Sequence, residues 1–138
     1  MNHPPIHRSK APLRLGLAGG GTDVAPFSDM FGGAILNATI SMFASATITP
    51  RTDGKIILHA LDKQQTLSFD LMPALPLDGE LDLIKGIYNR VVKDYTNEPL
   101  SFELTTWVDA PPGSGLGTSS TLVVAILGAF SEWLNLPL

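Results

Sequence analysis

The 138-residue sequence contains no cysteine, which excludes a disulfide framework and any metal site built on thiolates. Charged residues make up only 16% of the chain, and its net charge of −4 comes without a basic tract, so nothing indicates a nucleic-acid partner. The longest apolar run, 122–130, is far shorter than the roughly 20 residues that span a bilayer. The first eight residues lack the apolar segment of a signal peptide. These absences predict a cytoplasmic globular protein of about one domain, without a membrane partner.

What remains predicts a mixture of strands and helices. Residues 1–9 have no periodicity and are expected to form a flexible leader. Helical spacing predicts an amphipathic helix at 81–95 and a buried helix at 121–136. A short helix at 24–30 is expected to be capped by Thr22 or Asp23. Strands are expected at 11–18, at 34–40 and 44–49 (as one strand or two), and at 55–62, 65–70 and 101–108, with a hairpin turn at Asp53-Gly54.

A glycine-rich loop, PPGSGLGTSS at 111–120, lies between the last predicted strand and the buried helix. Glycines let a backbone curl so that several N–H groups converge on one anion, and a helix N-terminus adds partial positive charge. The hydroxyl groups of residues 118–120 can cap the helix or reach a phosphate-bound Mg²⁺. This order of strand, glycine loop and helix predicts a phosphate-binding loop.

Two well-known phosphate motifs do not match this loop. A Walker A loop needs a lysine before its Ser or Thr, and this loop contains none. The dinucleotide pattern G-x-G-x-x-G fails because Ser119 and Ser120 follow Gly117 where the third glycine should stand. A purely structural turn with a Ser/Thr cap is the alternative interpretation.

A second constellation is the segment APLRLGLAGGGTD at 11–23. Arg14 lies among apolar neighbours, and a charge in such a place is usually paired or functional. One interpretation is a partly buried salt bridge between Arg14 and Asp23 that closes the glycine loop. Another is that Asp23 caps a helix. His3, His7 and His59 are too scattered to suggest a metal site.

Together the two segments resemble the motifs of the GHMP kinases. The glycine loop is similar to their ATP-binding motif. The segment 11–23, with PFS at 26–28 and GGAILNATI at 32–40, is similar to the first motif of the D-glycero-D-manno-heptose 7-phosphate kinases. The resemblance covers nearly the whole chain. It implies an α+β fold like domain 2 of ribosomal protein S5, with a mixed sheet packed against helices.

The resemblance also implies an ATP-dependent sugar-phosphate kinase. Such an enzyme passes the γ-phosphate of ATP to the anomeric hydroxyl of heptose 7-phosphate, for activated-heptose and lipopolysaccharide synthesis. By this resemblance Arg14 lies near the transferred phosphoryl group and Ser119 binds Mg²⁺. The expected ATP-binding residues are Pro112, Gly113, Ser114, Gly115, Leu116, Gly117, Thr118 and Ser119. The expected sugar-binding residues are Gly20, Gly21, Thr22, Asp23 and Ser28.

The family pattern places a catalytic aspartate and a further glycine-rich motif beyond residue 138. Asp109 lies too close to the loop to take that role, and it is interpreted as a strand-end or turn residue. We therefore expect residues 1–138 to be the truncated ATP-binding domain, without the ferredoxin-like second domain and inactive by itself. The alternatives are a fucokinase- or galactokinase-like sugar kinase, a non-catalytic nucleotide-binding fragment, and glycine loops that are only structural. The sequence leaves the oligomeric state open.

Overall fold

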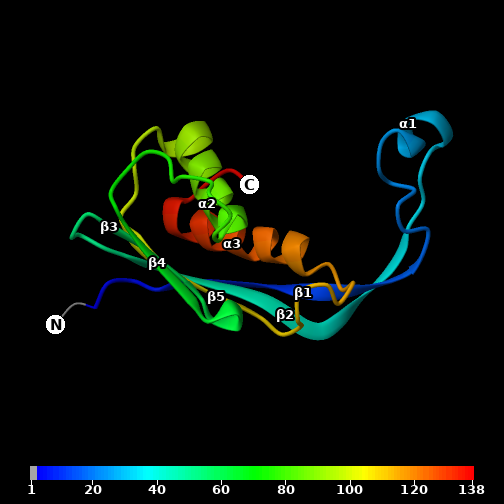
Figure 1. Ribbon diagram of the computed structural model, residues 1–138, viewed down its shortest axis with the longest axis horizontal. Coiled ribbons are helices and arrows are strands. Elements are labelled where there is room, and N and C mark those ends of the chain that lie inside the picture. Colours follow the sequence, from blue (N-terminus) through cyan, green and yellow to red (C-terminus); the bar gives the residue numbers. More distant parts are fainter. Residues whose placement is uncertain (1–2) are drawn as a thin grey trace.

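The computed structural model describes residues 3–138, which form one mixed β-sheet with helices on one of its faces (Figure 1). The strand order is β1-β2-β5-β3-β4. All neighbouring strands are antiparallel except β3 and β5, which are parallel. The strands are β1 (His7–Ala18), β2 (Leu36–Pro50), β3 (Lys55–Ala60), β4 (Gln65–Asp70) and β5 (Phe102–Val108). The predicted α+β class is therefore confirmed.

The two long helices lie where the apolar periodicity predicts them. Helix α2 (Asp82–Val91) continues into a π-helical turn, η2 (Val92–Thr96), and α3 (Thr118–Leu134) begins three residues earlier than expected. The core between the helices and the sheet contains Phe102, Phe130 and Tyr88, all at most 1% exposed. The ring centroids of Phe102 and Phe130 are 5.3 Å apart in an edge-on arrangement. Among the described residues, the structure has no helix whose length and hydropathy would suit a bilayer crossing.

The predicted hairpin at Asp53-Gly54 is wrong, although the chain does turn there. A hairpin would pair β2 with β3, but β5 lies between them and pairs with both. The observed hairpin is the next one along the chain, where β3 pairs with β4 through the 3-10 turn η1 (Leu61–Lys63). The Asp53-Gly54 signal predicts only a local turn. It carries no information on β5, which lies far along the chain and pairs between β2 and β3.

The N-terminal strand begins earlier than the sequence predicts. β1 starts at His7, so the last three residues of the expected leader are paired with β2. Residues 1 and 2 of that leader lie outside the described residues. The two predicted strands between 34 and 49 form one continuous strand, β2, of 15 residues. β1 and β2 extend beyond the rest of the sheet and carry an arm, residues 19–35, at their far end (Figure 1).

Lys85 of α2 is a charged residue with no exposed side-chain surface. Its Nζ donates to Asp78 (2.5 Å) and to the carbonyl oxygen of Pro76 (2.7 Å), and Asp82 lies 3.4 Å away. Burial lowers the pKa of Lys85, but the hydrogen bonds and charges of Asp78 and Asp82 outweigh this effect, so the pKa is raised. This charge cluster fixes the loop before α2 to the helix.

The lowered pKa values of Asp78 and Asp53 indicate that the free energy of unfolding falls in acid. The hydrogen bond from Lys85 lowers the pKa of Asp78 below its ordinary 3.8, and the one from Arg51 does the same for Asp53. A lowered folded-state pKa stabilises the fold above the unfolded-state pKa, and this contribution disappears as the pH falls through the folded-state pKa. We therefore expect the midpoint of urea unfolding to fall from pH 5 to pH 3.

Asp78→Asn should reduce this pH dependence, whereas Asp29→Asn, a change in the arm, should preserve it. An unfolding midpoint that stays constant from pH 5 to pH 3 in the wild-type chain would contradict the assignment.

Candidate phosphate-binding site

The loop between β5 and α3 has the backbone shape that the sequence predicts. Gly113, Gly115 and Gly117 have φ values of 79°, 74° and 73°, in the left-handed region that favours glycine. The loop leads directly into α3, a helix of 17 residues without an acidic side chain in its first turn. The partial positive charge of the helix N-terminus is therefore not neutralised by a carboxylate of that turn. The geometry suits an anion bound at the helix start.

The expected capping by residues 118–120 is wrong. Gly117, in the left-handed conformation, is the N-cap residue, and no side chain caps the helix. Thr118 and Ser119 are already inside the first turn, so their hydroxyl groups are not used as caps. Instead the Gly117 carbonyl oxygen accepts from the Thr121 hydroxyl (2.7 Å) and the Thr121 N–H (3.0 Å). The capping hypothesis failed because α3 begins at Thr118, so the predicted hydroxyl groups lie past the N-cap position.

Arg14 packs directly against this loop. A Cβ atom added to Gly117 would lie 2.3 Å from Arg14 Nη1, so only a glycine leaves room for the guanidinium. The Arg14 backbone N–H donates to the carbonyl oxygen of Leu116 (3.1 Å). The structure thus joins the N-terminal segment to the phosphate loop, although about 100 positions separate them in the chain.

The salt-bridge alternative for Arg14 is not observed. Arg14 is exposed rather than buried, and the ion pairs among residues 3–138 include none between Arg14 and Asp23. The pairing of β1 with β2 shifts register at this point: Pro12 pairs with Phe43 but Arg14 pairs with Thr39, so the extra residues lie on β2. The alternation of β1 continues through the buried Leu13, and the sequence pattern did not indicate the extra residues of β2.

Two cavities lie on either side of the start of α3. One, of about 70 Å³, is lined by Lys63, Pro112 and Ser119 among others, and the second, of about 240 Å³, by Arg14, Ser120 and Thr121. Lys63 and its neighbour Asp62 were not predicted as site residues. Because β3 and β5 are parallel, their carboxyl ends meet at one sheet edge, so η1 lies beside the loop. The position of Lys63 beside the loop could have been predicted only if the pairing of β3 with β5 had been known.

The predicted sugar-binding residues all lie on the arm. Thr22 Oγ1 accepts from the Ala34 N–H (3.1 Å), and its single hydrogen has two carbonyl oxygens within reach, those of Gly19 (2.7 Å) and Ala34 (3.0 Å). Its hydroxyl therefore closes the base of the arm, a structural task that the sequence did not predict. The expected cap on the short helix α1 (Phe27–Phe31) is absent, because Pro26 is the N-cap residue and no side chain bonds there.

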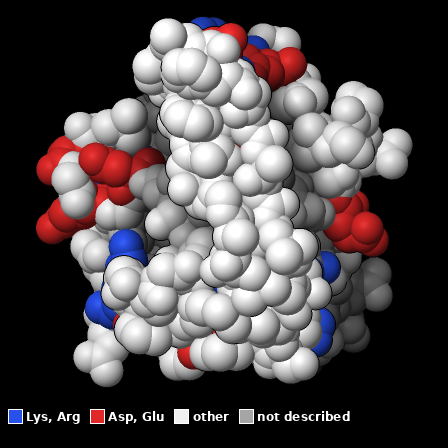
Figure 2. All heavy atoms as spheres, turned by 90° about the vertical axis from the view of Figure 1, so that its right-hand side faces the viewer, with Lys and Arg blue, Asp and Glu red and all other residues white. Residues whose placement is uncertain are grey.

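The arm itself presents an apolar and weakly charged surface. Asp23 is exposed and Ser28 is half-buried, while Gly20 and Gly21 have open space around them. Figure 2 faces the arm and shows that its front carries few charged side chains. The exposed apolar side chains of this region are Val24, Phe27, Met30, Phe31 and Ile35. The N-terminal motif is thus divided between the phosphate loop, which Arg14 contacts, and the arm.

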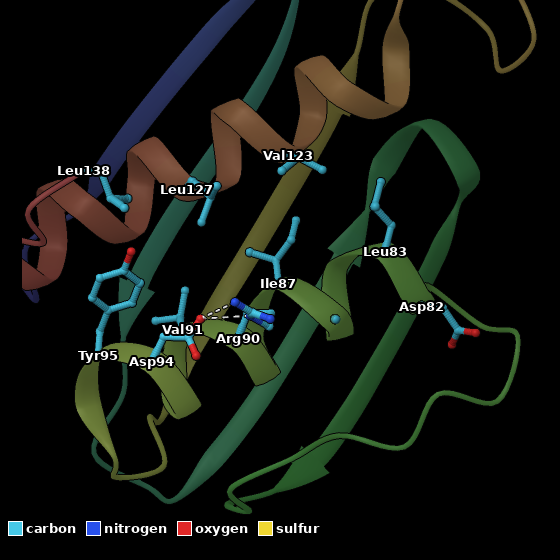
Figure 3. A pocket seen from close by; sticks show the side chains of 11 residues that line it. Asp82, Leu83, Ile87, Arg90, Val91, Asp94, Tyr95, Val123, Leu127 and Leu138 are labelled. Carbon is cyan, nitrogen blue, oxygen red and sulfur yellow. Dashed lines mark hydrogen bonds and ion pairs between the residues drawn. The ribbon is translucent and has the colours of Figure 1, made fainter. Parts of the chain in front are cut away.

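A third cavity, of about 520 Å³, lies between α2 and α3 (Figure 3). Ile87, Val91 and Leu127 point into it, and an ion pair of Arg90 with Asp94 (2.7 Å) lies at its edge. Its lining is mainly apolar, and the phosphate loop does not contribute to it. This groove therefore has no part in a phosphate site.

Comparisons with known proteins agree with this geometry. The sequence profile of the GHMP kinases N-terminal domain matches residues 82–138, which include the phosphate loop and α3. The D-glycero-alpha-D-manno-heptose 7-phosphate kinase of Campylobacter jejuni is 54% identical over 95% of this chain. The chain thus matches the N-terminal domain of the GHMP kinases in sequence. It spans 39% of the length of that curated relative.

Solved structures of GHMP kinases share the fold. A D-glycero-D-manno-heptose 1-phosphate kinase from Bacteroides thetaiotaomicron is 60% identical, with a TM-score of 0.92 over 97% of this chain and 44% of its own. Galactokinase from Lactococcus lactis has a TM-score of 0.77 at 24% identity, over 99% of this chain and 35% of its own, which shows a shared fold alone. Among curated sequences, the L-fucokinase/L-fucose-1-P guanylyltransferase of Bacteroides fragilis is 28% identical over 92% of this chain and 16% of its own length.

Proposed function

We propose that this chain is the ATP-binding part of a sugar-phosphate kinase, which transfers the γ-phosphate of ATP to the anomeric hydroxyl of D-glycero-D-manno-heptose 7-phosphate. The observation that carries the proposal is the contact of the Arg14 guanidinium with the glycine loop at the start of α3. A cation and a helix N-terminus that meet at one point attract the charge of a transferred phosphoryl group. ATP as the donor is consistent with a cytoplasmic enzyme.

In this proposal the N–H groups of residues 113–118 bind the β- and γ-phosphates. Arg14 stabilises the charge of the transferred phosphoryl group. The cavity lined by Lys63 and Ser119 receives part of the nucleotide. Asp23 accepts hydrogen bonds from sugar hydroxyls, since an ionised carboxylate can accept two at once. The exposed position of Asp23 supports this role, whereas the Thr22 hydroxyl is already engaged with the arm backbone.

The site also suits Mg²⁺ that arrives with the nucleotide. The described residues contain no group of three or more His, Cys, Asp or Glu side chains that could hold a metal ion. Mg²⁺ commonly keeps several waters and binds through few protein ligands plus the substrate phosphates. The Ser119 hydroxyl, at the cavity beside the loop, fits this limited role. The ion would neutralise phosphate charge.

Nucleotide binding by this chain is the first test of the proposal. Calorimetry with a non-hydrolysable ATP analogue should show one site in the presence of Mg²⁺. Ser119→Ala should weaken Mg²⁺-dependent binding by about tenfold, the value of one good polar contact to a charged ligand. Ser68→Ala, the same change on the exposed face of β4, should have no effect. Binding that is absent, or equal in both variants, would contradict the assignment.

The acceptor needs a separate experiment, because this chain spans less than half of its relatives. We suggest a chimera in which residues 1–138 replace the matching segment of the C. jejuni kinase. ATP consumption should be highest with heptose 7-phosphate and much lower with fucose or galactose. Preference for fucose would favour the fucokinase alternative, which the 28% identical relative represents.

A further inference from the structure

Asp109 closes the β2–β5 pair immediately before the phosphate loop. Its Oδ2 accepts from the backbone N–H of Phe43 (2.7 Å), and its Oδ1 accepts from Trp107 Nε1 (2.9 Å). The Asp109 N–H donates to the carbonyl oxygen of Phe43 (2.9 Å). Asp109 is therefore a strand-end residue, as predicted, but it makes three hydrogen bonds at the point where the loop begins.

These bonds tie the loop to the antiparallel pair of β1 and β2, here called the β1–β2 hairpin, whose strand β1 carries Arg14. Phe43 lies on β2 opposite Pro12 of β1, two positions before Arg14. The other end of the loop is tied to the same hairpin by the bond from the Arg14 N–H to Leu116 O (3.1 Å). Between the two ties the loop makes its own turn, in which the Ser114 N–H donates to the Pro111 carbonyl oxygen (3.2 Å).

We propose that Asp109 is a positioning residue that holds the phosphate loop in register with Arg14. The effect on ligand binding rests on the proposed function, whereas the effect on the free loop does not. The carboxylate suits the task because it accepts from two N–H donors on opposite sides without offering a donor itself. An amide in its place would turn an NH2 group towards one of these donors, and an alanine would leave both without this partner.

Hydrogen exchange of the free protein tests the positioning directly. Asp109→Ala should accelerate exchange of the amides at 110 and 113–118 by about tenfold, and Asp109→Asn by less, while exchange in α2 stays unchanged. Asp70→Asn is the matched control, because it makes the same acid-to-amide change at an 81% exposed position on β4. Loop exchange that equals the wild-type rate in Asp109→Ala would overturn the proposal. Uniformly faster exchange throughout the chain would also overturn it, since it would mean a general loss of stability.

The indole N–H of Trp107 gives a spectroscopic readout of the same contact. The chain has two tryptophans, and Trp133 lies in the aromatic cluster with Phe102 and Phe130. In a nitrogen–proton spectrum, Asp109→Asn and the Mg²⁺-bound ATP analogue should each shift the Trp107 indole signal more than that of Trp133. Asp109→Asn should also weaken binding of the ATP analogue by about tenfold, whereas Asp70→Asn should leave this affinity unchanged.

The two proposals fail in different ways. If the wild-type chain does not bind the analogue but Asp109→Ala still loosens the loop, the nucleotide assignment fails and the positioning role stands. If the analogue binds wild type and Asp109→Ala equally well, the positioning role in binding is wrong and the nucleotide assignment stands.

Discussion

Replacing Gly117 by alanine is expected to weaken binding of an ATP analogue by about a hundredfold or more, while the chain still folds. The new Cβ would lie 2.3 Å from Arg14 Nη1, and a flexible side chain yields before the backbone does. Arg14 would therefore leave the loop. The left-handed φ of 73° adds about 1–2 kcal/mol of strain for any residue with a Cβ. Calorimetry and urea unfolding measure the two effects separately.

Gly113→Ala is the matched control for this prediction. Gly113 has nearly the same φ, 79°, but a Cβ there would have no neighbour within 4 Å. The two variants therefore share the backbone strain and differ in the displacement of Arg14. Gly117→Ala should bind the analogue at least about tenfold more weakly than Gly113→Ala. Equal affinities would show that the contact with Arg14 does not matter for binding.

The second large effect is expected at Lys85, on stability rather than on binding. Lys85→Ala should lower the free energy of unfolding by about 2–4 kcal/mol, because it removes a buried side chain and separates the loop carrying Asp78 from α2. Lys85→Met, which keeps the aliphatic stem, should cost less. Urea unfolding at pH 7 measures both.

The control for Lys85 is Lys55→Ala on β3. The ion pair of Lys55 with Asp70 is solvent-exposed, with 47% and 81% of the two side chains accessible, and such pairs contribute at most about 1 kcal/mol. If Lys85→Ala and Lys55→Ala destabilise the chain equally, the charge cluster at Lys85 does not hold the loop.

Features governed by local spacing could be predicted from the sequence. The helical repeat of 81–95 and the alternation of 101–108 correspond to α2 with η2 and to β5. The glycines of the loop gave the correct site for the left-handed turns, because a positive φ is a local requirement. These patterns sufficed to predict a glycine loop at the start of α3.

Features governed by strand pairing could not be predicted in this way. The Asp53-Gly54 turn does not form a hairpin because β5, far along the chain, enters between β2 and β3. The same insertion brings Lys63 to the loop. The contact of Arg14 with Gly117 coincides with a register shift caused by extra residues in β2 and with the tie at Leu116, neither of which has a signal in the sequence. The pairing of distant strands thus brings the residues of the candidate site together, whereas the local glycine pattern determines the shape of its loop.

Hydrogen exchange with and without the Mg²⁺-bound ATP analogue is the most direct test of the central claim, that the loop and Arg14 together bind the nucleotide phosphates. The structure offers a competing cavity, the apolar groove between α2 and α3 (Figure 3). We expect new protection at residues 113–120 and around Arg14, with the groove-lining parts of α2 (83–91) and α3 (123–127) unchanged. Protection confined to the groove helices, with the loop unaffected, would contradict it.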